Sequence, residues 1–208
     1  VFNNAPKFQR STYTNGVKIM RGMLYATKDK KYVDTLMMVY DQRIKYFGKD
    51  RKYPEGWILG RKGSDLFKYK KKDIASVKEA YSIMKKSIEM QGLKSGASVI
   101  NNTMDASGIL VKAGEIEAEE VIDNYLFFMD MAAKQKAATT DQKKIDNYEN
   151  ARLNVERIFF KAGVADCETL SNIFTTKFEA NKDDMVLINK ILRMLNRQEC
   201  EDGALYAM

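Results

Sequence analysis

The sequence predicts an all-α fold, an array of antiparallel helical hairpins, from three observations. Apolar residues recur at steps of three and four along most of the chain. No segment alternates apolar and polar residues as a half-buried strand does. The tripeptide Lys-Ala-Gly occurs at Lys112–Gly114 and at Lys161–Gly163, each time between two amphipathic helical patterns. Because one hairpin cannot bury its apolar face alone, neighbouring hairpins are expected to stack around a continuous core.

The first hairpin is predicted from Ser11 to Gly48. The apolar positions of its first helix are four, three and four residues apart: Tyr13, Val17, Met20 and Leu24. The same kind of spacing returns after a polar break: Val33, Met37, Tyr40 and Ile44. Gly48 is expected to end the second helix in a left-handed conformation.

The second hairpin begins at Pro54-Glu55, where proline suits the first helical turn and the carboxylate suits the positive end of the helix dipole. Its first helix takes its apolar surface from Trp57, Ile58, Leu59, Leu66 and Phe67. Its second helix is expected between a cap at Asp73 and a stop at Gly92. The apolar face of that helix consists of Ile74, Val77, Tyr81, Met84 and Ile88.

Two further hairpins are predicted around the Lys-Ala-Gly copies, separated by a polar loop over Ala137–Asp141. Asp166 is expected to cap the helix after the second copy. A fifth first-helix follows over Asp184–Asn196, and Glu201–Tyr206 is typical of the opening of one more helix. The absence of an initial methionine and this ending predict a fragment of a longer chain.

Composition excludes several kinds of site. The net charge is +7, and acidic residues are interspersed with basic ones almost everywhere, which is a weak argument for a polyanionic partner. The densest basic segment, Lys68–Lys72, is interpreted as a solvated turn in preference to a phosphate-binding patch. The chain has no histidine, which removes Ser-His-Asp and Cys-His catalysis and histidine-based metal centres. We therefore predict no enzymatic activity, no cofactor, no metal site and no transmembrane segment.

Residues at the predicted turns resemble the tetratricopeptide repeat family. Phe178–Asp184 is similar to that family's junction between repeats, with Lys182 in place of the usual proline. Trp57–Gly60 is similar to the Trp-x-x-Leu-Gly of the first helix, one residue short. Small, large and small packing positions of the family are matched by Ala80, Met84 and Ser87. The two Lys-Ala-Gly turns lie farther apart than the family's period of about 34 residues, at a distance comparable to HEAT-type repeats.

The resemblance implies one domain over residues 1–208, a right-handed α-solenoid of about four and a half to five repeats. Segments such as Asp34–Arg43 look like a divergent group of the family in exported proteins of Bacteroides-like bacteria, which favours the periplasm or cell envelope. In this family the first helix of each hairpin lines the concave groove. By that analogy the candidate binding residues are Lys18, Arg21, Tyr25, Arg61, Lys68, Asn101, Asn102, Asp105, Asn154 and Arg157.

The two cysteines leave several interpretations open. Cys167 follows the predicted cap, and Cys200 falls where a later second-helix is expected to start. Equivalent positions in stacked hairpins lie about 8 to 10 Å apart, whereas a disulfide needs Cα atoms roughly 4.4 to 6.8 Å apart. Two small, partly buried residues are therefore the preferred interpretation, followed by a disulfide, which would suit an exported protein. Catalytic thiols are the least favoured, because no histidine can complete a nucleophilic pair.

Three functions are compared. The leading hypothesis is a non-catalytic scaffold that binds a peptide or a protein surface in the groove of the array, because the chain is repetitive and lacks a catalytic constellation. The alternative is a helical repeat that binds nucleic acid, which the positive charge favours only weakly. A hydrolase using carboxylates would need a deep pocket with two acidic side chains, and nothing in the sequence predicts one.

Overall fold

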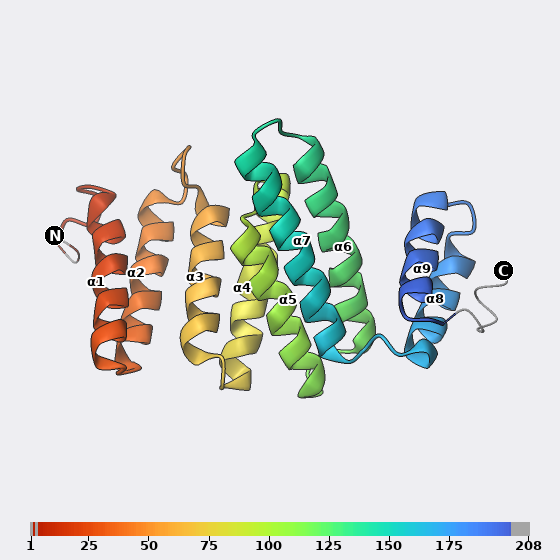
Figure 1. Cartoon of the computed structure of the whole chain (residues 1–208). Helices are drawn as coiled ribbons and strands as arrows, with labels where there is room; N and C mark the ends of the chain where they lie inside the picture. The colour runs from red at the N-terminus through yellow and green to blue at the C-terminus, as the bar shows by residue number, and fades with distance from the viewer. Residues whose placement is uncertain (1, 3, 201–208) are drawn as a thin grey trace. The chain divides into compact units, whose positions relative to one another are not determined.

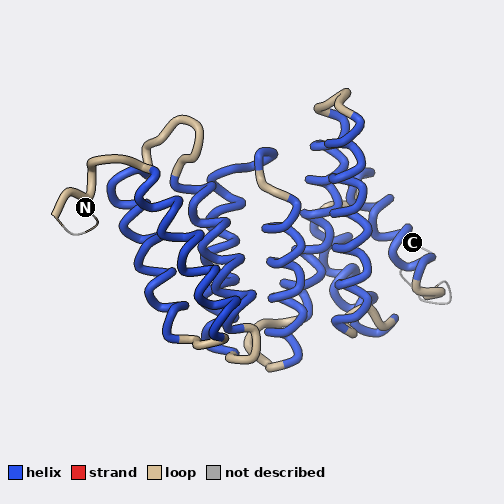
Figure 2. The backbone as a smooth tube through the Cα atoms, turned by 60° about the vertical axis from the view of Figure 1, so that its left-hand side comes forward, coloured by secondary structure: helices blue, strands red, loops and turns tan. Residues whose placement is uncertain are grey.

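The computed structural model describes residue 2 and residues 4–200. Within these residues it contains nine α-helices, one short 3-10 helix (η1, Gly92–Lys94) and no strand, which confirms the all-α prediction (Figure 2). The α-helices, labelled in Figure 1, are α1 (Ser11–Thr27), α2 (Lys31–Phe47), α3 (Glu55–Lys70), α4 (Ile74–Gln91), α5 (Ala97–Lys112), α6 (Ala118–Ala137), α7 (Gln142–Ala162), α8 (Cys167–Ala180) and α9 (Met185–Arg197). None of these helices is long and apolar enough to cross a bilayer.

The chain divides into two compact units, Val1–Ala106 and Ser107–Met208, and the boundary falls inside α5. In the first unit α1 packs on α2, α2 on α3, and α3 most extensively on α4, as expected for the first two hairpins. In the second unit the main packing joins α6 to α7, and α8 packs on α9. Tyr125 of α6 and Phe159 of α7 stack with their ring centroids 4.2 Å apart. A single array over the whole chain stays a prediction.

Aspartate side chains begin several helices at the predicted positions. Asp73 accepts a hydrogen bond from the backbone N–H of Ser76, and Asp166 accepts one from that of Thr169. Asp184 does the same for the first turn of α9. These caps supply acceptors for backbone N–H groups that have no partner within the helix, which explains why the predicted starts are met closely.

The Lys-Ala-Gly repeat ends helices. Gly114 (φ 71°) and Gly163 (φ 79°) adopt left-handed conformations directly after α5 and α7. At the first copy the N–H of Glu115 reaches back to the carbonyl of Leu110 at 2.9 Å, which closes the last turn. Gly48 does not behave in this way, because its φ is −64°. The left-handed stop predicted there is wrong: the chain turns while the Gly48 carbonyl accepts a hydrogen bond from the N–H of Glu55.

The buried face of α2 differs from the predicted one. Leu36, Val39 and Arg43 are buried together with Val33 and Tyr40. Met37 and Ile44, which the periodicity assigned to the core, are only half-buried. Because α2 packs against both α1 and α3, its buried stripe is wider than that of a helix with one neighbour and is centred on different residues.

Helices α3 and α4 approach closely through glycines. A methyl group added at Gly60 would lie 2.7 Å from the Ser87 hydroxyl, and one added at Gly63 would lie 2.5 Å from the Met84 side chain. The Ser87 hydroxyl donates a hydrogen bond to the Gly56 carbonyl at 2.7 Å, so the contact also contains a polar link between the helices. Ser87 and Met84 of α4 thus pack against positions of α3 that are glycine and have no side chain.

A glycine pair tests this close approach. We expect Gly63→Leu to lower the free energy of unfolding by about 1–3 kcal/mol, because the new side chain would overlap Met84 and approach the backbone. Gly22→Leu is the matched control: Gly22 lies in α1 with nothing near its Cβ position, so leucine should raise stability by about 0.5–1 kcal/mol. Urea denaturation followed by circular dichroism measures both. Equal effects of the two substitutions would contradict the packing.

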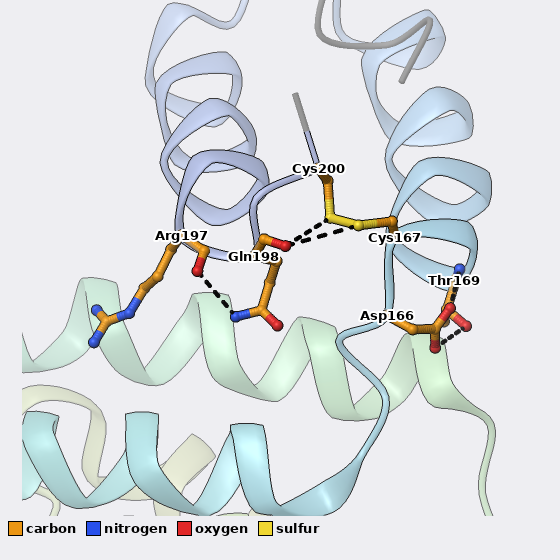
Figure 3. The surroundings of a disulfide bond; sticks show 6 residues. All are labelled: Asp166, Cys167, Thr169, Arg197, Gln198 and Cys200. Atoms are coloured by element: carbon orange, nitrogen blue, oxygen red, sulfur yellow. Dashed lines mark hydrogen bonds between the residues drawn. A yellow bond between two sulfur atoms is a disulfide. The ribbon is translucent and has the colours of Figure 1, made fainter. Parts of the chain in front are cut away.

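The cysteines form a disulfide between the start of α8 and the turn after α9 (Figure 3). Their Cα atoms are 5.4 Å apart, so the expected separation of 8 to 10 Å is wrong. The reason is the tight turn that follows α9. Glu199 takes a left-handed conformation, and the N–H of Cys200 bonds to the Leu195 carbonyl, which folds the turn back over the end of α9. The helix predicted from Glu201 lies outside the described residues.

Removal of this disulfide should destabilise the α8–α9 hairpin. The cysteines are 33 residues apart, and closing a loop of that length restricts the unfolded chain by about 3–4 kcal/mol. We expect the Cys167→Ser, Cys200→Ser double variant to lose stability of this order in urea denaturation. A reducing agent should shift the wild-type curve towards that of the variant and leave the variant's own curve in place. Coincident curves for wild type and variant without reductant would refute the prediction.

Candidate anion-binding cleft in the first unit

Charge is distributed unevenly between the two units. Residues 1–106 contain 22 Lys and Arg against 10 Asp and Glu, a net charge of +12, whereas residues 107–208 contain 13 against 18, a net charge of −5. The expectation that acidic residues are interspersed with basic ones almost everywhere does not describe this division between the units. A polyanion is therefore attracted much more strongly to the first unit than the net charge of +7 suggests.

Helices α1, α2 and α3 border a cleft with a volume of about 590 Å³. Its basic residues come from all three helices and the residue before α1: Arg10, Lys18, Arg21, Arg43 and Arg61. Its aromatic residues are Tyr40, Tyr53 and Trp57. We call this site, defined by these eight residues, the basic cleft. Its positive and aromatic lining suits an anionic ligand.

A buried carboxylate holds the walls of the basic cleft in place. Asp65 of α3 accepts a hydrogen bond from the Tyr40 hydroxyl of α2 at 2.7 Å and one from Arg21 Nε of α1 at 2.9 Å. Burial and the neighbouring Asp65 raise the pKa of the Tyr40 hydroxyl, so it remains a donor. Burial opposes the charge on Arg21, but Tyr40 and Asp65 outweigh it and raise the pKa of the guanidinium. Through these two hydrogen bonds, Asp65 connects α3 to α1 and to α2.

A second carboxylate shapes the rim of the basic cleft. Asp50, in the connection between α2 and α3, accepts hydrogen bonds from the backbone N–H groups of Tyr53 and Lys52. It also pairs with Arg10 at 2.5 Å. The bond from Tyr53 and the pairing with Arg10 lower the pKa of Asp50. The Arg10 guanidinium lies 5.0 Å from the centre of the Tyr53 ring. The α2–α3 connection therefore contacts the residue that precedes α1.

The other three cations of the basic cleft differ from Arg10 and Arg21. Within the described residues, the side chains of Lys18, Arg43 and Arg61 form no ion pair and no hydrogen bond. Arg43 is only 4% exposed and its Nε is buried without an acceptor. Burial, followed by the nearby charge of Arg10, lowers the pKa of its guanidinium. A buried guanidinium without a carboxylate is costly, and a bound anion would compensate that cost.

Trp57 lies between two of these cations. The guanidinium groups of Arg43 and Arg61 are each 5.2 Å from the centre of its ring. The ring supplies cation–π attraction but no hydrogen-bond acceptor, so the N–H groups of both arginines retain their capacity to bind a ligand.

The structure brings only some of the predicted binding residues together. Lys18, Arg21 and Arg61 all line the basic cleft. Tyr25 is 80% exposed and lies outside this lining, where it contacts Lys28, and Lys68 is exposed beside Tyr69.

The candidates on α5 and α7 serve other contacts. Asp105 pairs with Lys71, and the carbonyl oxygen of the Asn101 side chain is buried without a partner; Asn102 is half-buried on the same helix. On α7, Arg157 donates to Asn154 at 3.4 Å. None of these five residues lines a described cleft, so the prediction that they contribute to a shared groove stays a prediction.

The most distinctive site residue, Arg43, was absent from the sequence candidates. The resemblance implies a groove lined by the first helix of each hairpin, whereas Arg43 belongs to α2, the second helix of its hairpin. A signal was nevertheless present. Arg43 stands three residues after Tyr40, on the same helical face as the apolar residues Val39 and Leu36. An arginine in an apolar stripe predicts either a buried ion pair or a ligand site.

The second unit has a cleft of a different character. It has a volume of about 400 Å³ and lies between α6, α7 and α9. Its buried carboxylate, Glu156, pairs with Arg152 and Arg197, and Asp130 pairs with Lys190. Burial, followed by Glu156, raises the pKa of Tyr125 to about 12. Because most charges of this cleft are matched, it presents less unsatisfied charge than the basic cleft.

Comparisons with known proteins assign no family to this chain. The chain matches no family model, no curated protein and no solved structure. The resemblance to tetratricopeptide repeats therefore stays a prediction.

Two arginines of the basic cleft should differ in their contribution to stability. We expect Arg21→Met to lower the free energy of unfolding by about 2–3 kcal/mol, because it leaves buried Asp65 without its charge partner; Arg21 is one-third exposed, which reduces the loss. Arg43→Met should change stability by less than about 1 kcal/mol, because no carboxylate loses a partner. Urea denaturation of both variants measures the difference. A larger loss for Arg43→Met would show that Arg43 has a structural role instead.

Proposed function

We propose that this chain is a non-catalytic interaction protein whose basic cleft receives an acidic segment of a partner protein. The observation that supports this most strongly is that one cation from each of α1, α2 and α3 lines a single cleft, and none of the three has a carboxylate partner among the described residues. The net charge of +12 on the first unit would draw an acidic partner from a distance. In this proposal the helices belong to a right-handed, tetratricopeptide-like solenoid of an exported bacterial envelope protein.

Nucleic acid is the second candidate, favoured by the same positive charge and by the aromatic rings of the cleft. A nucleic-acid backbone needs a series of phosphate contacts along a surface. Several lysines elsewhere in the first unit are occupied by carboxylates: Lys62 with Asp41, Lys70 with Asp34, Lys71 with Asp105 and Lys86 with Glu55. Lys18, Arg43 and Arg61 share one cleft with the Trp57 ring, and a cleft of about 590 Å³ suits a short anionic segment of a protein.

The single tryptophan of the chain reports on this site directly. Trp57 lines the basic cleft, so its fluorescence should change saturably on titration with a Glu-rich peptide, and a matched Gln-rich peptide should leave it unchanged. Lys18→Gln and Arg61→Gln should each weaken binding roughly 10-fold, the loss of one charge-assisted hydrogen bond. Lys68→Gln is the control, because it removes the same charge outside the cleft and should have little effect.

Two outcomes would contradict the proposal. If the Glu-rich and Gln-rich peptides gave the same response, charge would not govern recognition. If an oligonucleotide of equal charge bound more tightly than the Glu-rich peptide, with a steep salt dependence, the nucleic-acid alternative would replace it.

A further inference from the structure

The carboxylates beside the basic cleft form no hydrogen bond or ion pair with Arg43, although the charge of Asp50 acts on its guanidinium. Asp65 is shared between Arg21 and Tyr40, and Asp50 is occupied by Arg10 and two backbone N–H groups. Arg43 is nevertheless buried, and its Nε finds no acceptor within the described residues. An anionic ligand in the cleft would supply the acceptor that this guanidinium lacks and would offset the cost of burying its charge.

The number of unpaired cations indicates the charge of that ligand. A single carboxylate has two oxygens and one negative charge, so it matches one forked guanidinium. A phosphate monoester has three free oxygens and a charge near −2 at neutral pH, and can be shared among several cations. Lys18, Arg43 and Arg61 approach from three different helices, an arrangement that suits a compact group with acceptors in several directions.

The types of the cations support the same conclusion. Two of the three are arginines, whose planar forks pair with phosphate oxygens, and both are held against the Trp57 ring. Arg43 is fixed by burial and Trp57 is half-buried, so little conformational freedom would be lost when a phosphate binds. Lys18 and Arg61 are exposed at the rim, where they can adjust to the ligand.

We propose that Lys18, Arg43 and Arg61 form a subsite for a phosphate monoester carried by the partner polypeptide, so that the basic cleft recognises a phosphorylated side chain. This inference rests on the proposed function and specifies its ligand. The step is binding only, and no bond is made or broken.

Titration of Trp57 fluorescence with matched peptides tests the subsite. The first peptide carries one phosphoserine; the second replaces it with two glutamates, so that the net charge is equal. We expect the phosphopeptide to bind at least about 10-fold more tightly. Arg43→Lys keeps the charge and loses the fork, so it should weaken phosphopeptide binding at least about 10-fold and weaken glutamate-peptide binding much less. Circular dichroism and urea denaturation confirm that the variant is folded, and Lys18→Gln provides a second variant at an exposed position.

A pH series separates the two anions further. The second pKa of a phosphate monoester is about 6, so phosphopeptide affinity should fall between about pH 7.5 and pH 5, where the glutamate peptide stays largely ionised. The cations facing the ligand are Arg10, Lys18, Arg21, Arg43 and Arg61. The other ionisable groups beside it are Tyr40, Asp50, Tyr53 and Asp65. None is a histidine, because the chain has none, so a change near pH 6 would report protonation of the phosphate.

The outcomes distinguish this inference from the proposed function. If both peptides bind equally tightly, without a pH dependence near the phosphate pKa, the phosphate subsite is refuted and the acidic-segment function stands. If neither peptide binds, both fail. Inorganic phosphate is added as a competitor: displacement of the phosphopeptide at equal concentration would assign the site to free phosphate and overturn the phosphopeptide proposal. Tighter binding of an oligonucleotide of equal charge would also overturn it.

Discussion

The basic cleft depends on the buried carboxylate of Asp65. It lies on α3, accepts hydrogen bonds from Arg21 on α1 and Tyr40 on α2, and thereby connects the three helices that form the walls. The carboxylate has a charge partner and two hydrogen-bond donors, which is the condition under which a buried charge is tolerated. Because α3 is itself fixed to α4 through glycines, the cluster sits on the most closely packed part of the unit.

This cluster also determines which cations of the cleft have a carboxylate partner. Arg10 forms an ion pair with Asp50, and Arg21 forms one with Asp65, so the positive charges of these two arginines are balanced within the protein. Lys18, Arg43 and Arg61 are left over, and Arg43 is held in a buried position that other contacts impose. Among the described residues, the buried Nε of Arg43 therefore has no hydrogen-bond acceptor where it lines the cleft. Such a local conflict is typical of sites where binding, and not stability, explains the residue.

The second unit is organised by different interactions. It carries net negative charge, its α8–α9 hairpin is closed by a disulfide, and long basic side chains connect that hairpin to α6 and α7. Lys177 pairs with Glu119 and Asp123, and Arg197 with Glu156. Lys177 pairs with exposed carboxylates and contributes little, whereas Glu156 is buried, and the disulfide adds a covalent restraint to the hairpin.

Periodicity and capping residues in the sequence were sufficient to predict the helices, because both are local: a helical face repeats every three to four residues, and Asp73, Asp166 and Asp184 act within one turn. Lys18, Arg21 and Arg61 could likewise be named from their place on first helices. Whether each cation is paired could be decided only by the tertiary structure, because Asp65 is 44 residues from Arg21 in the chain. The tertiary structure also decided the surroundings of Arg43, because its burial leaves the Nε without an acceptor. It decided the pairing of the cysteines as well, because that pairing depends on the turn at Glu199.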